Sequence, residues 1–256
     1  MVKHMDQDRV PLNGQNGHTH NGHKNLEDLH GHLLGEWAGA GSALVDRPVE
    51  ASLAPADRVG GVSPATTREQ RKVDYTRLLE LGRELLLAVG EDPSREGLLD
   101  TPRRWADWWR EFIEYDPGTT ETTFQSMASD QMVCVSGMRV FSLCEHHLLP
   151  MWCDVSIGYI TGERVLGLSK FARIAHQYAH QLQIQERLGV QIADEVSRIA
   201  GTNNVAVVIQ GEHLCMSARG IRTAGLMTSS VMRGVFQDEY QTRMEFLHLI
   251  EMHKKR

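Results

Sequence analysis

The residues best suited to chemistry form two groups, Cys144-Glu-His-His147 and, far downstream, His213-Leu-Cys215. Cys144 and His147 are three residues apart, a spacing that lets both side chains reach one metal ion from the turn after a strand. His213 and Cys215 are expected on a strand, where residues two apart face the same side. Structural zinc sites normally use four protein ligands, often in paired clusters, and the third thiol here has no paired partner. Three ligands and an open position therefore indicate a catalytic zinc site.

The remaining central cysteines and histidines have simpler interpretations. Cys134 and Cys153 lie in strand-like segments and are predicted to be buried apolar thiols. His176 and His180 are four residues apart and imitate a helical zinc pair. They lack the glutamate and the third ligand of that motif, so we predict that they lie on a solvated helix face.

A second group of residues is basic. Ser169-Lys170 opens a predicted helix, Arg173 lies one turn further along, and Arg219-Gly220 follows Cys215. A helix N-terminus with Lys and Arg around it is a good anion site. Each of these charges alone is more often an ordinary surface charge. Next to a zinc site, together they indicate a phosphorylated substrate.

Composition narrows the class of protein. The 256 residues are 41% hydrophobic and 23% charged, which is ordinary for a soluble globular protein, and the net charge of -6 argues against general nucleic-acid binding. No apolar run approaches the ~20 residues that span a membrane, and residues 1–25 lack the apolar core of a signal peptide. We expect a cytoplasmic protein with no membrane or nucleic-acid partner. Its four cysteines are then thiols or metal ligands rather than disulfides.

Residues 1–66 differ from the rest of the chain. They are rich in Gly, Asn, His, Ala and Pro, and they contain six of the thirteen histidines. This composition predicts a flexible extension, with metal binding by its histidines as the less favoured alternative. Leu26, Leu29, Leu33 and Trp37 would share one face of a short helix within it. The predicted domains are therefore an extension over 1–66 and a folded domain over 67–256.

The folded domain shows two hydrophobic periods. A helix up to Gly90 is predicted after a capping box at Thr67–Gln70, and a second helix after Thr101, with an apolar stripe of tryptophans. From Gln131 the period changes to two, which is typical of strands. Further elements follow as strands at 133–135, 140–143, 155–159, 165–168, 205–209, 213–218 and 229–236, and as helices at 169–182, 184–199 and 238–252. This order predicts an α+β fold with helices on one side of an antiparallel sheet.

Several motifs occur together and in a particular order: Leu143-Cys-Glu-His-His147, Gly167-Leu-Ser-Lys170, Gln183-Ile-Gln-Glu-Arg187, Gly201-Thr-Asn-Asn204 and His213-x-Cys215-x-x-x-Arg219-Gly220. From about Thr67 to its C-terminus, the chain resembles the GTP cyclohydrolase I family. The resemblance implies a T-fold, in which a helix pair packs on one face of an antiparallel sheet, tiled into a ring-shaped homodecamer. It also implies zinc-dependent hydrolysis of GTP to 7,8-dihydroneopterin triphosphate and formate.

The resemblance implies roles for individual residues. Cys144, His147 and Cys215 would bind Zn2+, and His146 and His213 would be catalytic. Glu186, with Gln185 beside it, would hold the guanine edge. The remaining substrate-binding residues would be Ser169, Lys170, Arg173 and Arg219, together with Arg104 from a neighbouring subunit.

Two positions depart from the family pattern. Asp107 stands where many members have Lys, and Ser217 stands where some bacterial members have Lys. Both changes remove positive charge near the expected triphosphate.

Two alternatives belong to other classes. A T-fold nitrile reductase would need a nucleophilic cysteine and a nicotinamide cofactor rather than a Cys/His/Cys set. A non-catalytic paralogue that binds a purine or pterin would be expected to have lost a zinc ligand or a catalytic histidine, and none is lost here.

Overall fold

The computed structural model describes residues 71–127 and 130–254. The predicted extension over 1–66, its boundary, its short helix and the capping box at Thr67–Gln70 lie outside these ranges. Within the described ranges, no helix combines the length and the apolar character needed to cross a membrane.

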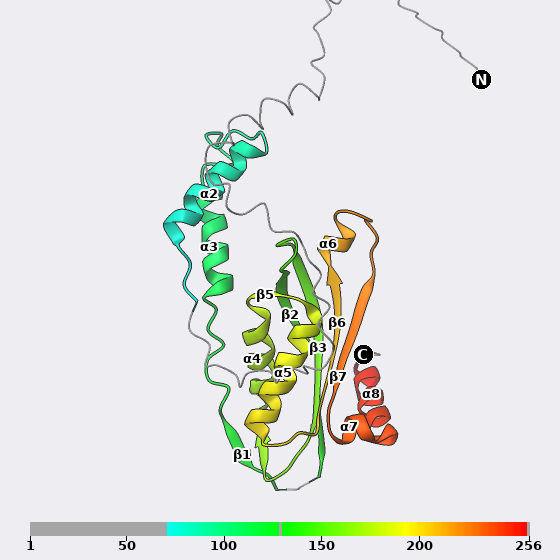
Figure 1. The fold of residues 1–256 in the computed structure, drawn as a ribbon. Helices are drawn as coiled ribbons and strands as arrows, with labels where there is room; N and C mark the ends of the chain where they lie inside the picture. The colour runs from blue at the N-terminus through cyan, green and yellow to red at the C-terminus, as the bar shows by residue number, and fades with distance from the viewer. Residues whose placement is uncertain (1–70, 128–129, 255–256) are drawn as a thin grey trace, which may run out of the picture. The chain divides into compact units, whose positions relative to one another are not determined.

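The centre of the fold is a five-stranded sheet with the order β5-β2-β3-β6-β7 (Figure 1). The long strands are β2 (Met132–Cys144), β3 (Pro150–Ile160), β6 (Val205–His213) and β7 (Leu226–Met232), and each pairs antiparallel to its neighbour. The short β5 (Leu182–Gln183) pairs parallel to the end of β2. A separate two-stranded sheet joins β1 (Thr123–Gln125) to β4 (Arg164–Leu166). The predicted α+β class is confirmed, with one parallel pair added.

Strand β2 is continuous where the sequence predicted two separate strands. Its register against β3 shifts between Val135 and Met138. Gly137 lies in this irregularity with φ +73°, a conformation that a residue with a side chain rarely adopts. The bulge therefore interrupts the sequence periodicity without ending the strand.

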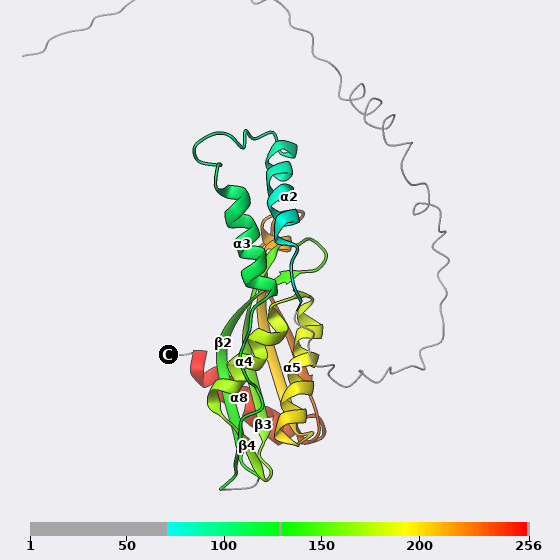
Figure 2. The ribbon, with the colours of Figure 1, turned by 90° about the vertical axis from the view of Figure 1, so that its left-hand side faces the viewer.

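Helices α4 (Leu168–Ala179) and α5 (Gln185–Ala200) cover one face of the sheet (Figure 2). Both were predicted, and their apolar faces pack against alternate residues of the strands, as on β6, where Val205, Val207 and Ile209 point to this side. Each apolar side chain buried there contributes about 1.5–3 kcal/mol. This core therefore fixes the start of α5 against the ends of the strands.

The opposite face of the sheet is also partly covered. Helices α7 (Val235–Asp238) and α8 (Tyr240–Lys254) bring Phe236 and Phe246 against Ala206 and Val208 of β6. A Cβ on Gly158 would lie 2.5 Å from the Phe246 ring, so this close approach requires glycine. The expectation of helices on one side only was therefore wrong. Strand β7 also ends at Met232, and Phe236 belongs to α7 rather than to a strand.

Helices α2 (Tyr75–Ala88) and α3 (Thr101–Ile113) pack against each other as a hairpin. Asp74 caps α2 by accepting a hydrogen bond from the Arg77 amide at 2.9 Å. Asp100 occupies the cap position of α3, and Pro102 lies in its first turn. Within the hairpin, Asp107 accepts hydrogen bonds from Tyr75, Arg103 and Arg110. Asp107, one of the two departures from the family pattern, therefore has hydrogen-bond donors within the hairpin itself.

Candidate metal centre and active site

Strand β2 ends in a tight turn that carries Cys144 and both neighbouring histidines. The carbonyl of Cys144 accepts hydrogen bonds from the amides of His147 (3.4 Å) and Leu148 (2.8 Å), and its own amide donates to the Leu149 carbonyl at 2.9 Å. Leu148 has φ +55°, which a leucine adopts only under local strain. The chain then returns along β3, so the side chains of the turn stand at the end of the sheet.

The three predicted metal ligands, Cys144, His147 and Cys215, come together, and we call them the metal group. The ligand atoms of Cys144, His147 and Cys215 all lie within 4.8 Å of one another. The Cys144 Sγ is 3.9 Å from the His147 Nδ1. Two thiols and an imidazole suit zinc, whereas calcium and magnesium prefer oxygen ligands. The donor set therefore fits Zn2+.

Cys215 reaches this position from an unexpected element. Strand β6 ends at His213, and Leu214–Ser217 form the single helical turn α6. The prediction of a strand over 213–218 was therefore wrong, and Cys215 does not share a strand face with His213.

The pKa of the Cys215 thiol is raised above its usual value. Burial raises this pKa most, the hydrogen bond with Cys144 raises it further, and the charge of Arg219 lowers it. A divalent cation would act in the opposite direction, because metal coordination favours the thiolate. A metal ion bound here would therefore have to displace the thiol proton.

His146 lies beside the same thiol as His147. Its Nδ1 is 3.8 Å from the Cys144 Sγ, and the two histidine rings are inclined at 73° with centroids 6.2 Å apart. Both histidines are exposed. Only His147 belongs to the group with Cys215.

His213, at the end of β6, stands between the metal group and α5. Its Nε2 is 2.9 Å from Gln185 Oε1. Burial lowers the pKa of His213, and the charge of Glu186 raises it. Glu186 itself is exposed in the first turn of α5, while the preceding Gln185 is fully buried. The structure therefore brings His213 into contact with Gln185, and Glu186 follows Gln185 in the chain.

The predicted anion-binding residues are less concentrated. Lys170 is buried and its Nζ donates to the Thr119 carbonyl at 2.7 Å, while Arg173 donates to the Pro117 carbonyl at 3.0 Å. Both cations thus hold the segment that follows α3. The other predicted residues are exposed: Ser169 at the start of α4, Arg219 after α6, and Arg104 on α3, where it pairs with Asp100 at 3.4 Å. Ser217, the second departure, donates to the His213 carbonyl at 3.3 Å.

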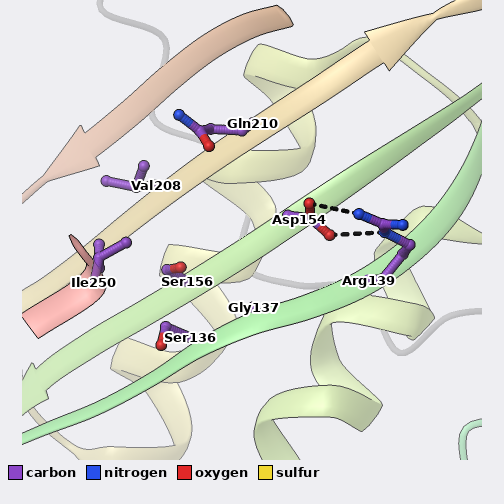
Figure 3. Close-up of a pocket in the computed structure, with 8 residues that line it drawn as sticks. All are labelled: Ser136, Gly137, Arg139, Asp154, Ser156, Val208, Gln210 and Ile250. Carbon is purple, nitrogen blue, oxygen red and sulfur yellow. Dashed lines mark hydrogen bonds and ion pairs between the residues drawn. The ribbon is translucent and has the colours of Figure 1, made fainter. Parts of the chain in front are cut away.

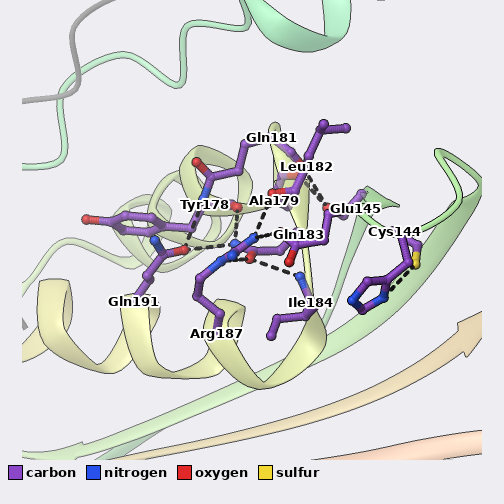
Figure 4. Close-up of polar contacts among 12 residues, drawn as sticks. Cys144, Glu145, Tyr178, Ala179, Gln181, Leu182, Gln183, Ile184, Arg187 and Gln191 are labelled. Atoms are coloured by element: carbon purple, nitrogen blue, oxygen red, sulfur yellow. Dashed lines mark hydrogen bonds and ion pairs between the residues drawn. The ribbon is translucent and has the colours of Figure 1, made fainter. Parts of the chain in front are cut away.

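Arg187 supports the site, although the sequence analysis gave it no role. It donates to the Glu145 carboxylate, to Gln183 Oε1 (2.6 Å) and to the Leu182 carbonyl (2.9 Å), as Figure 4 shows. The Glu145 amide donates in turn to the Gln183 carbonyl at 3.1 Å. This network attaches the histidine turn to α5. The i, i+4 spacing of Gln183 and Arg187 is the sequence signal that indicates it.

A hollow of about 420 Å³ lies elsewhere, on the sheet face opposite α4 and α5. It contains the ion pair of Arg139 and Asp154, whose two contacts are both 2.9 Å (Figure 3). Neither a thiol nor an imidazole lines it. Among the described residues, the candidate metal ligands therefore lie outside this hollow.

Comparisons with known proteins agree with the site. The family model of GTP cyclohydrolase I matches residues 79–251. The GTP cyclohydrolase 1 of Hyperthermus butylicus is 42% identical over 182 residues, covering 71% of this chain and 94% of that protein. The GTP cyclohydrolase 1 of Corynebacterium glutamicum is 46% identical over 190 residues, covering 72% of this chain and 96% of that protein. The metal group and both candidate catalytic histidines lie inside the matched region.

Proposed function

Because this chain belongs to the GTP cyclohydrolase I family, we propose that it hydrolyses GTP to 7,8-dihydroneopterin triphosphate and formate. The observation that carries the proposal is the convergence of Cys144, His147 and Cys215 within 4.8 Å. A Zn2+ ion bound there would supply Lewis-acid activation of water for attack on C8 of guanine. We further propose that these three residues are its ligands.

His146 and His213 are the proposed proton-transfer groups. Imidazole titrates near neutral pH, so each ring can both accept and donate a proton during the opening of the guanine imidazole ring. The position of His146 beside Cys144, and of His213 two residues before Cys215, supports this assignment. One of them protonates N7 as the ring opens, and a second hydrolysis releases formate. The opened ribose then rearranges and closes onto the amines.

Glu186 is the proposed selector of the base. A carboxylate can accept two hydrogen bonds from the N1–H and the 2-amino group of guanine, a donor pair that adenine lacks. Its exposure at the first turn of α5 supports this role, because the preceding Gln185 contacts His213 at 2.9 Å.

The triphosphate is assigned to the basic residues. Ser169 at the start of α4, with Lys170, Arg173 and Arg219, supplies hydrogen-bond donors and positive charge, and we propose that Arg104 acts from a neighbouring subunit. A homodecamer of T-fold subunits, with active sites at subunit interfaces, would bring that arginine to the site. We place the enzyme in the cytoplasm, with residues 67–256 as the catalytic domain and residues 1–66 as an extension.

The test is direct. Purified protein loaded with Zn2+ is incubated with GTP, and formate and pterin fluorescence are measured over time. We expect both products to form in equal amounts. Binding of GTP without formate would instead indicate a non-catalytic paralogue, and formate without a pterin would show that only the ring opening occurs.

A further inference from the structure

The side chain of Gln185 has partners that suggest a different role from contact with guanine. It is 0% exposed at the first position of α5. Its Nε2 lies 3.1 Å from the Ile209 carbonyl, 3.1 Å from the Met227 carbonyl and 3.0 Å from Ser229 Oγ. These partners belong to the paired strands β6 and β7. The amide therefore joins α5 to two strands.

These contacts fix the direction of the amide. A main-chain carbonyl can only accept a hydrogen bond, so the nitrogen of the amide, not its oxygen, must face Ile209 and Met227. The oxygen is then left on the side of His213, where Oε1 is 2.9 Å from Nε2 of the ring. Flipping the amide would lose both hydrogen bonds to the carbonyls and place oxygen against oxygen.

The fixed oxygen in turn determines the state of the histidine ring. An amide oxygen can only accept, so Nε2 of His213 must carry the hydrogen. In a neutral imidazole only one nitrogen carries a proton, which leaves the lone pair on Nδ1. The contact therefore fixes the direction in which the His213 ring is turned.

Gly211 makes room for this contact. A Cβ at this position would lie 2.3 Å from Gln185 Oε1 and 3.1 Å from the Cys153 sulfur. Glycine inside a strand weakens the strand, and it often marks a place where another group approaches closely. Here the group that approaches is the oxygen that faces His213.

We propose that Gln185 is the positioning residue of His213. It holds the ring in one orientation with the proton on Nε2, and Gly211 leaves the space that this contact needs. The inference rests on the proposed function, in which His213 transfers protons. Gln185 then acts on turnover rather than on the affinity for GTP.

The central test separates turnover from binding. In Gln185→Leu we expect kcat to fall about 10- to 100-fold, the usual effect of removing a group that orients a functional histidine. KM for GTP and the zinc content per chain should stay within about twofold of the parent protein. A raised KM with unchanged kcat would overturn the proposal and assign Gln185 to the substrate instead. An unchanged kcat and KM would overturn both roles.

A neighbouring glutamine provides the control. Gln210 precedes Gly211 on the same strand, donates to Thr228 and lines the hollow on the opposite face. Gln210→Leu should leave kcat, KM and zinc content unchanged. A loss of kcat equal to that of Gln185→Leu would show that removing any glutamine hydrogen-bonded to this strand pair disturbs the site, and the proposal would fail.

A second variant keeps the proposal testable if Gln185→Leu folds poorly. Gly211→Ala should displace Oε1 and lower kcat, whereas in a Gln185→Ala background it should lower kcat no further, because only the 3.1 Å contact with the Cys153 sulfur then remains. An equal loss from Gly211→Ala in both backgrounds would overturn the proposal.

Comparison with His213→Ala separates this inference from the proposed function. Full activity in His213→Ala would remove His213 from the mechanism, and the proposed function would have to change. A large loss in His213→Ala, but none in Gln185→Leu or Gly211→Ala, would leave His213 catalytic and refute only the positioning role.

Discussion

Two pairs of neighbouring histidines in this protein differ in spacing and have very different surroundings. His146 and His147 are exposed on the turn after β2, beside the Cys144 thiol. His176 and His180 are four residues apart at the end of α4, where the His180 ring stacks on Tyr115 with centroids 3.9 Å apart and Phe112 lies against it at 5.2 Å. The metal group among the described residues includes His147 and neither member of the second pair.

The second pair is not the solvated face that the sequence predicted. Both rings are half-buried, and His180 Nδ1 is 2.8 Å from the His176 carbonyl. The residues that cover them come from α3 and the segment after it, which the helical period of α4 does not reveal. His147 belongs to a group that could hold a metal ion because α6, far along the chain, brings Cys215 beside it.

The largest effects are expected at the first pair. His147→Ala, Cys144→Ala and Cys215→Ala should each lose zinc and activity together. His146→Ala should keep about one zinc per chain and lose about 10²- to 10⁴-fold in turnover, the usual range for a general acid or base. Elemental analysis and turnover are measured on the same samples. A zinc-free His146→Ala beside a zinc-replete His147→Ala would reverse the two roles.

A smaller effect is expected when the support of the first pair is removed. Arg187→Ala breaks the contacts with Glu145, Gln183 and Leu182 that attach the turn to α5. The affinity for Zn2+ should fall about 10- to 100-fold, because the orientation of ligands depends on the groups behind them. Competition with a chelator measures this loss. Arg139→Ala, which breaks a surface ion pair on the other face, is the control.

Breaking the second pair should affect stability and not chemistry. His180→Ala removes the ring that stacks on Tyr115 and should cost about 1–3 kcal/mol in the free energy of unfolding. Zinc content and kcat should not change. Denaturant unfolding measures the loss. His248→Ala, at an exposed position of α8, is the matched control. Loss of zinc from His180→Ala would contradict the comparison.

The smallest effect concerns pH. Burial lowers the pKa of His176, whose ring lies against Tyr115 and His180, so the unfolded chain binds a proton that the folded chain resists. The stabilisation is therefore present above the ordinary histidine pKa of about 6.5 and is lost as the pH falls below it. His176→Leu should remove this dependence, seen as a difference of roughly a few degrees in Tm between pH 8 and pH 5. Equal pH dependence in both proteins would contradict it.

Much of the fold was readable from the sequence because apolar periodicity is strong in β3, β6, α4 and α5. Prediction from apolar periodicity failed where the hydrophobic pattern is short or mixed. Four residues of α6 are too few to show a helical period, and β7 alternates partly buried positions with exposed Thr228 and Ser230. The second face of β6 is apolar too, but nothing in its own residues indicates that α8 covers it.

The sequence indicated the candidate metal ligands, but it did not indicate the residues that hold the site in position. The family resemblance implied Cys144, His147 and Cys215 as ligands, and their ligand atoms do lie within 4.8 Å of one another. The roles of Gln185 and Gly211 depend on the close approach of α5, β6 and β7, which the printed order of residues does not contain. Likewise, the attachment of Lys170 and Arg173 to the carbonyls of residues 117–119 joins segments about 50 residues apart.

The separation of Cys144 and Cys215 also bears on how the protein folds. The two thiols are 71 positions apart in the chain and meet only when β2, β3 and β6 have paired. Contacts of such long range close slowly, because the entropy of the intervening loop must be lost first. We therefore expect the nascent chain to assemble its sheet before it can capture a metal ion, unlike a small zinc module whose ligands nucleate the fold. A shortage of metal during synthesis should then yield folded, inactive protein that zinc can later restore.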